Sequence, residues 1–210
     1  MSSLDTKDAG PASWVHQGQF LAGKGDHAAA IDLYDRAIAT DPHYAEAYAW
    51  KASSLLAIGD IDAAETGITE ALKLNNQDAH FHVIAGRVWV ARGQVEKARE
   101  SYDQAAKLAP KKAGTFYADL ASALAARNDP KLNAPIESAL KAAAASDPPN
   151  LDALFTLGQS YAIAGKQEGR TYLQQYLDAS NKLPEDQRDL QKTRLAKQMI
   201  RAMDIVRGEG

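Results

Sequence analysis

The same residue types return every 34 positions along the first half of the chain. Three periods follow one another without a gap, and the matching residues are Gly25, Gly59 and Gly93; Ala30, Ala64 and Ala98; Tyr34, Ile68 and Tyr102; and Ala37, Ala71 and Ala105. A fixed period of this length is typical of a small structural unit stacked on copies of itself. The period therefore predicts the fold and much of the functional class, although it names no partner.

Inside each period the apolar residues are three or four positions apart, which places them on one face of a helix. Each period contains two such apolar stripes, separated by Gly-Asp in the first two periods and by Gly-Gln in the third. Glycine can end a helix in the left-handed conformation, and aspartate can cap the next helix. Each unit is therefore predicted to be a helix, a tight turn and a second helix, with a further turn near Pro42 and Pro110. Gly59→Val is expected to destabilise the protein, because a β-branched residue tolerates left-handed backbone poorly.

This pattern resembles the tetratricopeptide repeat, a 34-residue motif with aromatic, glycine, alanine and proline residues at set positions. The first period matches it with Trp14, Gly18, Leu21, Ala30, Tyr34, Ala37 and Pro42. The third period departs at its first position, where His82 is interpreted as a part-buried substitute for the usual aromatic residue. The resemblance implies an all-α, superhelical solenoid of antiparallel helix pairs.

The phase loosens after residue 112, where two less regular units are predicted. After a flexible segment at residues 1–10, about five repeats are expected at residues 11–44, 45–78, 79–112, 114–150 and 151–183. The fourth has a turn lengthened around residues 128–130. Residues 184–210 predict an amphipathic helix, from Pro184 or Glu185 to Arg207, and a tail; this helix caps the exposed last repeat. Its apolar stripe comprises Leu195, Ala196, Met199, Ile200, Met203 and Val206.

Composition argues against several functional classes. The chain has 210 residues, a net charge of −3 and no cysteine. This charge argues against general nucleic-acid binding, and the lack of cysteine removes disulfides and thiolate metal sites. No apolar stretch approaches the roughly 20 residues of a membrane span, and the first residues lack a signal-peptide core. We therefore expect a cytoplasmic or periplasmic protein without membrane insertion.

No residue pattern predicts catalysis, a cofactor or a metal centre. The segment from Gly165 to Thr171 lacks the spacing of a phosphate-binding loop and falls at an expected repeat turn. His80 and His82 point to different sides of a helix. Ser13 and His16 have no aspartate that would complete a hydrolase triad. The hypothesis is therefore that the chain is not an enzyme and carries no cofactor.

Surface recognition is the remaining hypothesis. In the family that the sequence resembles, the face of each first helix opposite its packing face lines a concave groove. The residues expected there are His16 and Gln19; Glu46, Trp50 and Ser53; His80, Ile84 and Arg87; Asp119 and Ser122; and Asp152, Thr156 and Gln159, with Val15, Val83 and Phe155 at its flanks. Family members that hold chaperone tails use a set of lysine, asparagine and arginine residues that this chain lacks. A chaperone-tail partner is therefore not expected.

Trp50, Ile84 and Arg87 stand out among these positions, because large apolar residues are unexpected on a polar face. Tryptophan and arginine are common binding hot spots. Alternatively, Trp50 packs against neighbouring first helices and sets the curvature of the groove, and both interpretations are left open.

The predicted function is a non-catalytic scaffold or adaptor that binds a partner protein or peptide in this groove. A role in assembling a bacterial complex is suggested by analogy with the family alone. The alternative is a structural protein that forms homo-oligomers through its repeat ends or its terminal helix.

Overall fold

The structure is a computed structural model that describes residues 10–207. These residues form eleven α-helices and three short 3-10 helices, and no strand occurs among them. The chain divides between Leu108 and Ala109 into two compact units, which are described separately. The predicted all-α class is confirmed. The predicted flexible segment lies outside the described residues, apart from Gly10.

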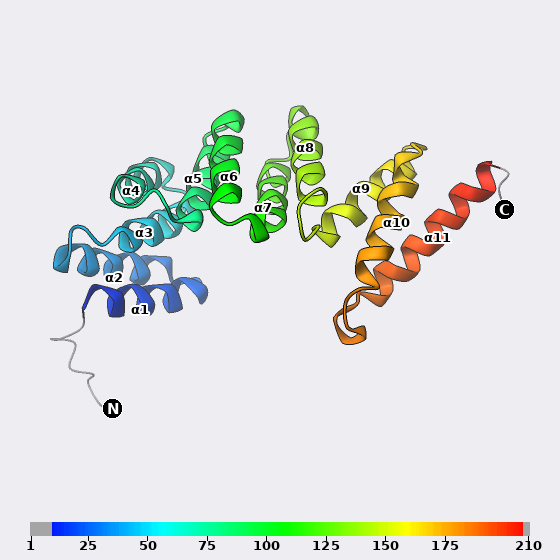
Figure 1. Cartoon of the computed structure of the whole chain (residues 1–210). Coiled ribbons are helices and arrows are strands. Elements are labelled where there is room, and N and C mark those ends of the chain that lie inside the picture. Colours follow the sequence, from blue (N-terminus) through cyan, green and yellow to red (C-terminus); the bar gives the residue numbers. More distant parts are fainter. Residues whose placement is uncertain (1–9, 208–210) are drawn as a thin grey trace. The chain divides into compact units, whose positions relative to one another are not determined.

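Three helix pairs make up the first unit (Figure 1). Their bounds are α1 Pro11–Gly23 and α2 His27–Thr40; α3 Ala45–Ala57 and α4 Ile61–Leu74; and α5 Ala79–Ala91 and α6 Val95–Leu108. The helices of each pair pack together, α2 contacts α3, and α4 contacts α5. The first helices also touch one another, α1 with α3 and α3 with α5, so they lie side by side.

The turns inside these pairs have the predicted chemistry. Gly25, Gly59 and Gly93 have φ angles of 87°, 85° and 76°, which is the left-handed region. The carboxylate of Asp26 accepts a hydrogen bond of 3.1 Å from the backbone N–H of Ala29. Asp60 caps α4 in the same way. The spacing of glycine and aspartate in the sequence therefore fixes where each helix ends and the next one begins.

A Cβ added at Gly25 would meet no atom within 4 Å, so lack of space does not require glycine there. The left-handed backbone conformation is the reason for glycine at this position. We expect Gly25→Ala to lower the free energy of unfolding by about 1–2 kcal/mol, the cost of left-handed backbone. Gly23, at the end of α1, has equally open surroundings without a positive φ. Gly23→Ala should therefore leave stability unchanged or slightly raised. Urea denaturation of both variants measures the difference, and equal losses at the two positions would contradict this explanation.

In the first and third repeats, a glycine on the first helix makes room for a tyrosine on the second. A Cβ at Gly18 would lie 2.5 Å from Cε1 of Tyr34, and a Cβ at Gly86 would lie 2.5 Å from Cε2 of Tyr102. Both tyrosines are fully buried. The two helices of each pair can approach this closely only because the glycine has no side chain.

His82 performs the role of the aromatic residue that it replaces. Its Nε2 lies 2.9 Å from the carbonyl oxygen of Asn76. One repeat earlier, the Tyr48 hydroxyl donates a hydrogen bond of 3.2 Å to the carbonyl oxygen of Pro42. These two pairs are 34 positions apart in the sequence, so both side chains fasten a first helix to the loop before it. The interpretation of His82 as a part-buried substitute is confirmed.

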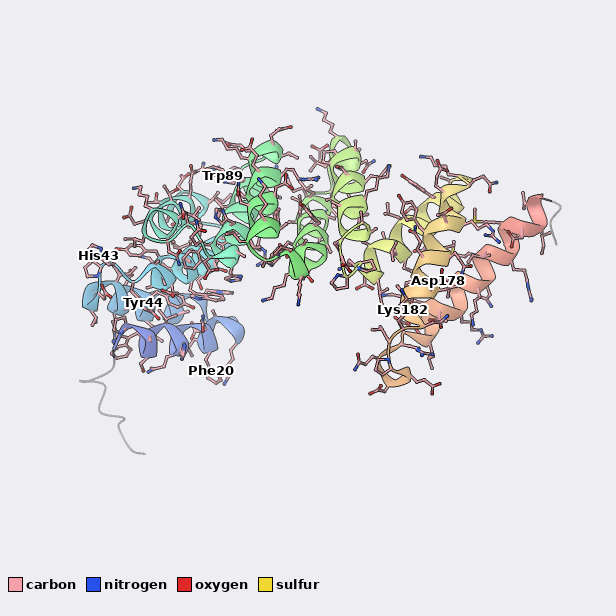
Figure 2. All side chains as sticks on the ribbon, in the orientation of Figure 1. Phe20, His43, Tyr44, Trp89, Asp178 and Lys182 are labelled. Carbon is pink, nitrogen blue, oxygen red and sulfur yellow. The ribbon has the colours of Figure 1, made fainter. Side chains whose placement is uncertain are left out.

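The second unit contains two further helix pairs and a terminal helix. Its bounds are α7 Ala113–Ala125, α8 Asn133–Ala144, α9 Leu151–Ile163, α10 Glu168–Ser180 and α11 Leu190–Arg207, with 3-10 helices η2 Pro110–Lys112, η3 Pro130–Leu132 and η4 Glu185–Gln187. The lengthened turn of the fourth repeat contains η3, as predicted. Of the segment from Gly165 to Thr171, the first three residues form the expected turn, and the rest belongs to α10. Lys182, labelled in Figure 2, lies just after the end of α10.

The terminal helix packs on both helices of the fifth repeat, because α11 contacts α9 and α10. Ala196 is fully buried, and Met199 and Ile200 pack against the same apolar cluster. Leu195 and Val206 do not belong to the buried stripe, since they are 38% and 88% exposed. The sequence prediction was wrong for these two residues because α9 and α10 cover a narrower arc of the helix than the apolar pattern suggests.

The start of the terminal helix also differs from the prediction. Glu185–Gln187 is a separate 3-10 turn, and α11 begins only at Leu190. Asp189 explains this start, because its carboxylate accepts a hydrogen bond of 2.9 Å from the backbone N–H of Lys192. A side chain that caps the first turn in this way marks a helix N-terminus.

Candidate partner-binding site

The candidate site is the face that α1, α3 and α5 form in the first unit, which we call the first-helix face. These three helices contact one another in order. The predicted groove residues that they carry with partly or fully accessible side chains are His16, Gln19, Glu46, Trp50, Ser53, His80 and Arg87. The face is therefore polar, with one large aromatic residue on its middle helix.

Trp50 joins two helices of the first-helix face. Its ring centroid lies 4.7 Å from that of His80 on α5, with the two planes tilted by 39°. It also packs against the apolar cluster that contains Trp14, Val15 and Tyr34. Trp50 is nevertheless only half-buried. The packing interpretation is thus supported, and part of the indole remains available to a partner.

Ile84 does not line the candidate site, which corrects the prediction from the sequence. It is 1% exposed and belongs to a core cluster with Ala49 and Ala52 of α3. The flanking residues Val15 and Val83 are also buried. Ile84 stands one repeat after Trp50, but at this position α5 is covered by α3, so helix periodicity alone misplaced it.

The predicted groove residues of the second unit have varied environments. Phe155 is 7% exposed and packs edge-on against Tyr176, with ring centroids 5.4 Å apart, so its predicted place at the groove is wrong. The Ser122 hydroxyl donates a hydrogen bond within its own helix, to the carbonyl oxygen of Ala118. The remaining members of the set are partly or fully accessible, namely Asp119, Asp152, Thr156 and Gln159.

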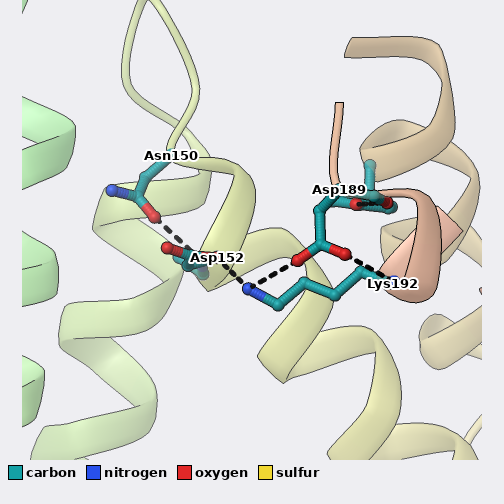
Figure 3. A network of polar contacts seen from close by, with 6 residues as sticks. Asn150, Asp152, Asp189 and Lys192 are labelled. Carbon is teal, nitrogen blue, oxygen red and sulfur yellow. Dashed lines mark hydrogen bonds and ion pairs between the residues drawn. The ribbon is translucent and has the colours of Figure 1, made fainter. Parts of the chain in front are cut away.

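Asp152 is bound by the terminal helix. Lys192 of α11 places its Nζ 2.6 Å from the Asp152 carboxylate and 3.6 Å from that of Asp189 (Figure 3). The hydrogen bond to Asp152 raises the pKa of Lys192. Asn150, at the start of α9, caps this helix by accepting a hydrogen bond from the Ala153 N–H. Asp152 therefore helps to hold α11 on the fifth repeat.

A group of titratable side chains connects α8 to α9 in the second unit. The Tyr161 hydroxyl donates a hydrogen bond to Glu137, and Lys141 Nζ lies 2.6 Å from the same carboxylate. The hydrogen bonds from Lys141 and then Tyr161 lower the pKa of Glu137. Lys166 lies over the Tyr161 ring, 4.8 Å from its centroid. The bond between Tyr161 and Glu137 joins α9 to α8, which is a structural role.

The described part of the chain shows neither a metal-binding cluster nor a membrane-spanning helix. Within it, no group of three or more histidine, aspartate or glutamate residues is arranged to hold a metal ion. Across residues 10–207, no helix has the length and apolar character needed to cross a bilayer.

Comparisons with known proteins agree with this geometry. Residues 21–88 match the model of the tetratricopeptide repeat family. No curated protein matches the sequence significantly. This match, over the residues that it covers, confirms the family predicted from the sequence.

Solved structures with the same fold include MamA, at 19% identity and a TM-score of 0.58 over 79% of this chain and 95% of that one. YrrB, described as a tetratricopeptide-repeat protein with an unusual peptide-binding site, is 21% identical with a TM-score of 0.54 over 92% of this chain and 94% of that one. A thermophilic tetratricopeptide-repeat protein of Thermus thermophilus is 19% identical with a TM-score of 0.56 over 90% of this chain and 98% of that one. At these identities, the similarity concerns the fold.

Proposed function

We propose that the protein is a non-catalytic adaptor that binds a protein or peptide on the first-helix face. The observation that carries the proposal is the half-buried Trp50, whose ring lies against that of His80 and which is surrounded by accessible polar residues. Tetratricopeptide repeats generally serve as interaction modules, and the similar structure of YrrB is described as having a peptide-binding site. The expected compartment, cytoplasm or periplasm, is part of this proposal.

The chemistry of the first-helix face favours a partner segment with one apolar anchor and mixed polar neighbours. The indole of Trp50 offers an apolar contact that is already held in place by its packing, so little side-chain entropy is lost on binding. Glu46 on α3 and Arg87 on α5 provide charges of opposite sign on the same face. Arg87 is exposed and suits a carboxylate or carbonyl group of the partner.

We expect Trp50→Ala to weaken partner binding by about 2 kcal/mol or more, which is the range of an interface hot spot. A peptide selected from a display library against the full chain supplies the ligand, and isothermal titration calorimetry measures the affinity. Ile58→Ala is the control, because Ile58 is a large apolar residue, 55% exposed, that follows the end of α3 and is not one of the residues of the first-helix face.

Circular dichroism should show unchanged helical content in both variants. Normal binding by Trp50→Ala and by Arg87→Ala would place the partner elsewhere. A loss of folding in Trp50→Ala would mean that this residue serves packing rather than recognition.

Self-assembly is a second candidate function, favoured by the exposure of large apolar residues on the terminal helix. Ile205 is 63% exposed and Val206 is 88% exposed. Light scattering over a dilution series separates the two proposals, because a self-assembling protein changes its mean mass with concentration. An adaptor is expected to keep one mass throughout the series.

A further inference from the structure

The terminal helix α11 packs on the fifth repeat as the first helix of a sixth repeat would. It lacks the small residue that most first helices carry at their eighth position. It contacts α9 and α10 as α5 contacts α3 and α4. In four of the five repeats, the eighth residue of the first helix is small, namely Gly18, Ala52, Gly86 and Gly158. The eighth residue of α11 is Lys197, which is exposed. The surface on which a second helix would pack is therefore open, and it presents a cation at its centre.

Lys197 belongs to a continuous row of exposed side chains along α11, which we call the outer stripe. At 100° per residue, its members fall within an arc of about 80°. They are Leu190, Arg194, Lys197, Arg201 and Ile205. Leu190 and Ile205 are 71% and 63% exposed, and no ion pair to the three cations occurs within the described chain. The outer stripe thus has two apolar ends and three uncompensated positive charges between them.

A groove of about 360 Å³ runs beside the outer stripe, between α10 and α11. Leu177 and Ile200 contribute apolar surface to it, next to Lys197 and Arg201. The acidic group in this groove is Asp204, and its carboxylate is held by Arg170 at 2.7 and 3.3 Å. This carboxylate is therefore engaged by Arg170 and forms no ion pair with the cations of the stripe.

We propose that the outer stripe and this groove bind an acidic, amphipathic helix of a partner protein. The open surface has the place and direction of a second repeat helix, and helix-in-groove binding uses apolar anchors spaced along one helical face. Carboxylates between those anchors would meet Arg194, Lys197 and Arg201 with complementary charge. This surface is distinct from the first-helix face.

Two other occupants fit the outer stripe less well. A symmetric contact with the α11 of a second copy would bring like charges together, which costs binding energy. A membrane-surface helix must bury a broad apolar face in the lipid interface. In α11 that face, with Ala196, Met199 and Ile200, is already packed on the fifth repeat.

The test uses the full chain and a labelled 18-residue helical peptide with leucine at its ends and glutamate every three or four residues between them. An otherwise identical peptide carries glutamine in place of glutamate. We expect the acidic peptide to bind more tightly than the glutamine peptide, and R194E/K197E/R201E to weaken its binding by about tenfold or more. The control K107E/K111E/K112E changes the net charge equally at exposed lysines outside α11 and should bind like the unmodified chain.

A second variant, Leu190→Ala with Ile205→Ala, keeps the charges and removes the exposed apolar ends. It should also weaken the acidic peptide, whereas a thermal melt should stay near that of the unmodified chain. Equal losses in both triple charge variants would overturn the proposal in favour of a net-charge effect. Binding to phosphatidylserine vesicles without binding to the acidic peptide would overturn it in favour of a membrane surface. Binding of neither probe would likewise overturn it.

Discussion

Truncation after Lys182 is expected to lower the melting temperature markedly, because it removes α11 from the fifth repeat. Ala196, Met199 and Ile200 pack on this repeat. Burial of large apolar side chains contributes roughly 1.5–3 kcal/mol each before entropy costs, so the loss should amount to several kcal/mol. The truncation also removes the ion pair between Arg170 and Asp204. A thermal melt measures the change in stability.

The same truncation uncovers apolar surface that should bind a hydrophobic dye. Phe155, Leu173 and Leu177 belong to the cluster on which α11 packs. Ile200→Ala is expected to reproduce part of the loss of stability, whereas Val206→Ala should have almost no effect, because Val206 is 88% exposed. Unchanged stability of the truncated chain, together with loss of a partner, would show that α11 is an interaction arm instead of a cap.

Gly86→Ala is expected to destabilise the third repeat, although alanine favours helix more than glycine does. The new Cβ would lie 2.5 Å from the ring of the fully buried Tyr102. Overpacking of this kind typically costs about 1–3 kcal/mol. The change in the urea midpoint measures the effect, and Gly23→Ala serves again as a helical glycine with open surroundings.

The second repeat suggests how this loss can be rescued. At the equivalent positions it has Ala52 and Ile68, both buried in one core cluster. We therefore expect Tyr102→Ile to restore part of the stability of Gly86→Ala, although it destabilises the unmodified chain. A double-mutant cycle measures this coupling. Additive effects of the two changes would show that the glycine and the tyrosine do not depend on each other.

The sequence predicted the helices and their turns well because short-range chemistry determines them. Left-handed glycine and a capping aspartate act within a few residues, so Gly59 and Asp60 could be assigned without knowledge of distant contacts. The same holds for His82, whose bond to Asn76 repeats that of Tyr48 at the same offset. These features follow from spacing along the chain alone.

The candidate site was harder to predict because exposure depends on neighbouring helices. Ile84 and Trp50 occupy equivalent positions of the repeat. Helix α3 buries Ile84, whereas part of Trp50 stays accessible. Periodicity assigns a side chain to a direction around its own helix and does not show how much of that direction a neighbour covers. For the same reason, Leu195 and Val206 were assigned to a buried stripe and are exposed.

The alternation of glycine–tyrosine and alanine–isoleucine pairs distinguishes the second repeat from the first and the third. Because the repeats are alike in length and pattern, a chain that is still folding could join a second helix to the wrong first helix. A tyrosine of the first or third repeat would then meet Ala52 in place of a glycine, and its ring would have too little space. Such mismatched pairs are disfavoured sterically, which is a form of selection against alternative structures. The difference between an alanine and a glycine on the first helix thus disfavours exchange of second helices between adjacent repeats.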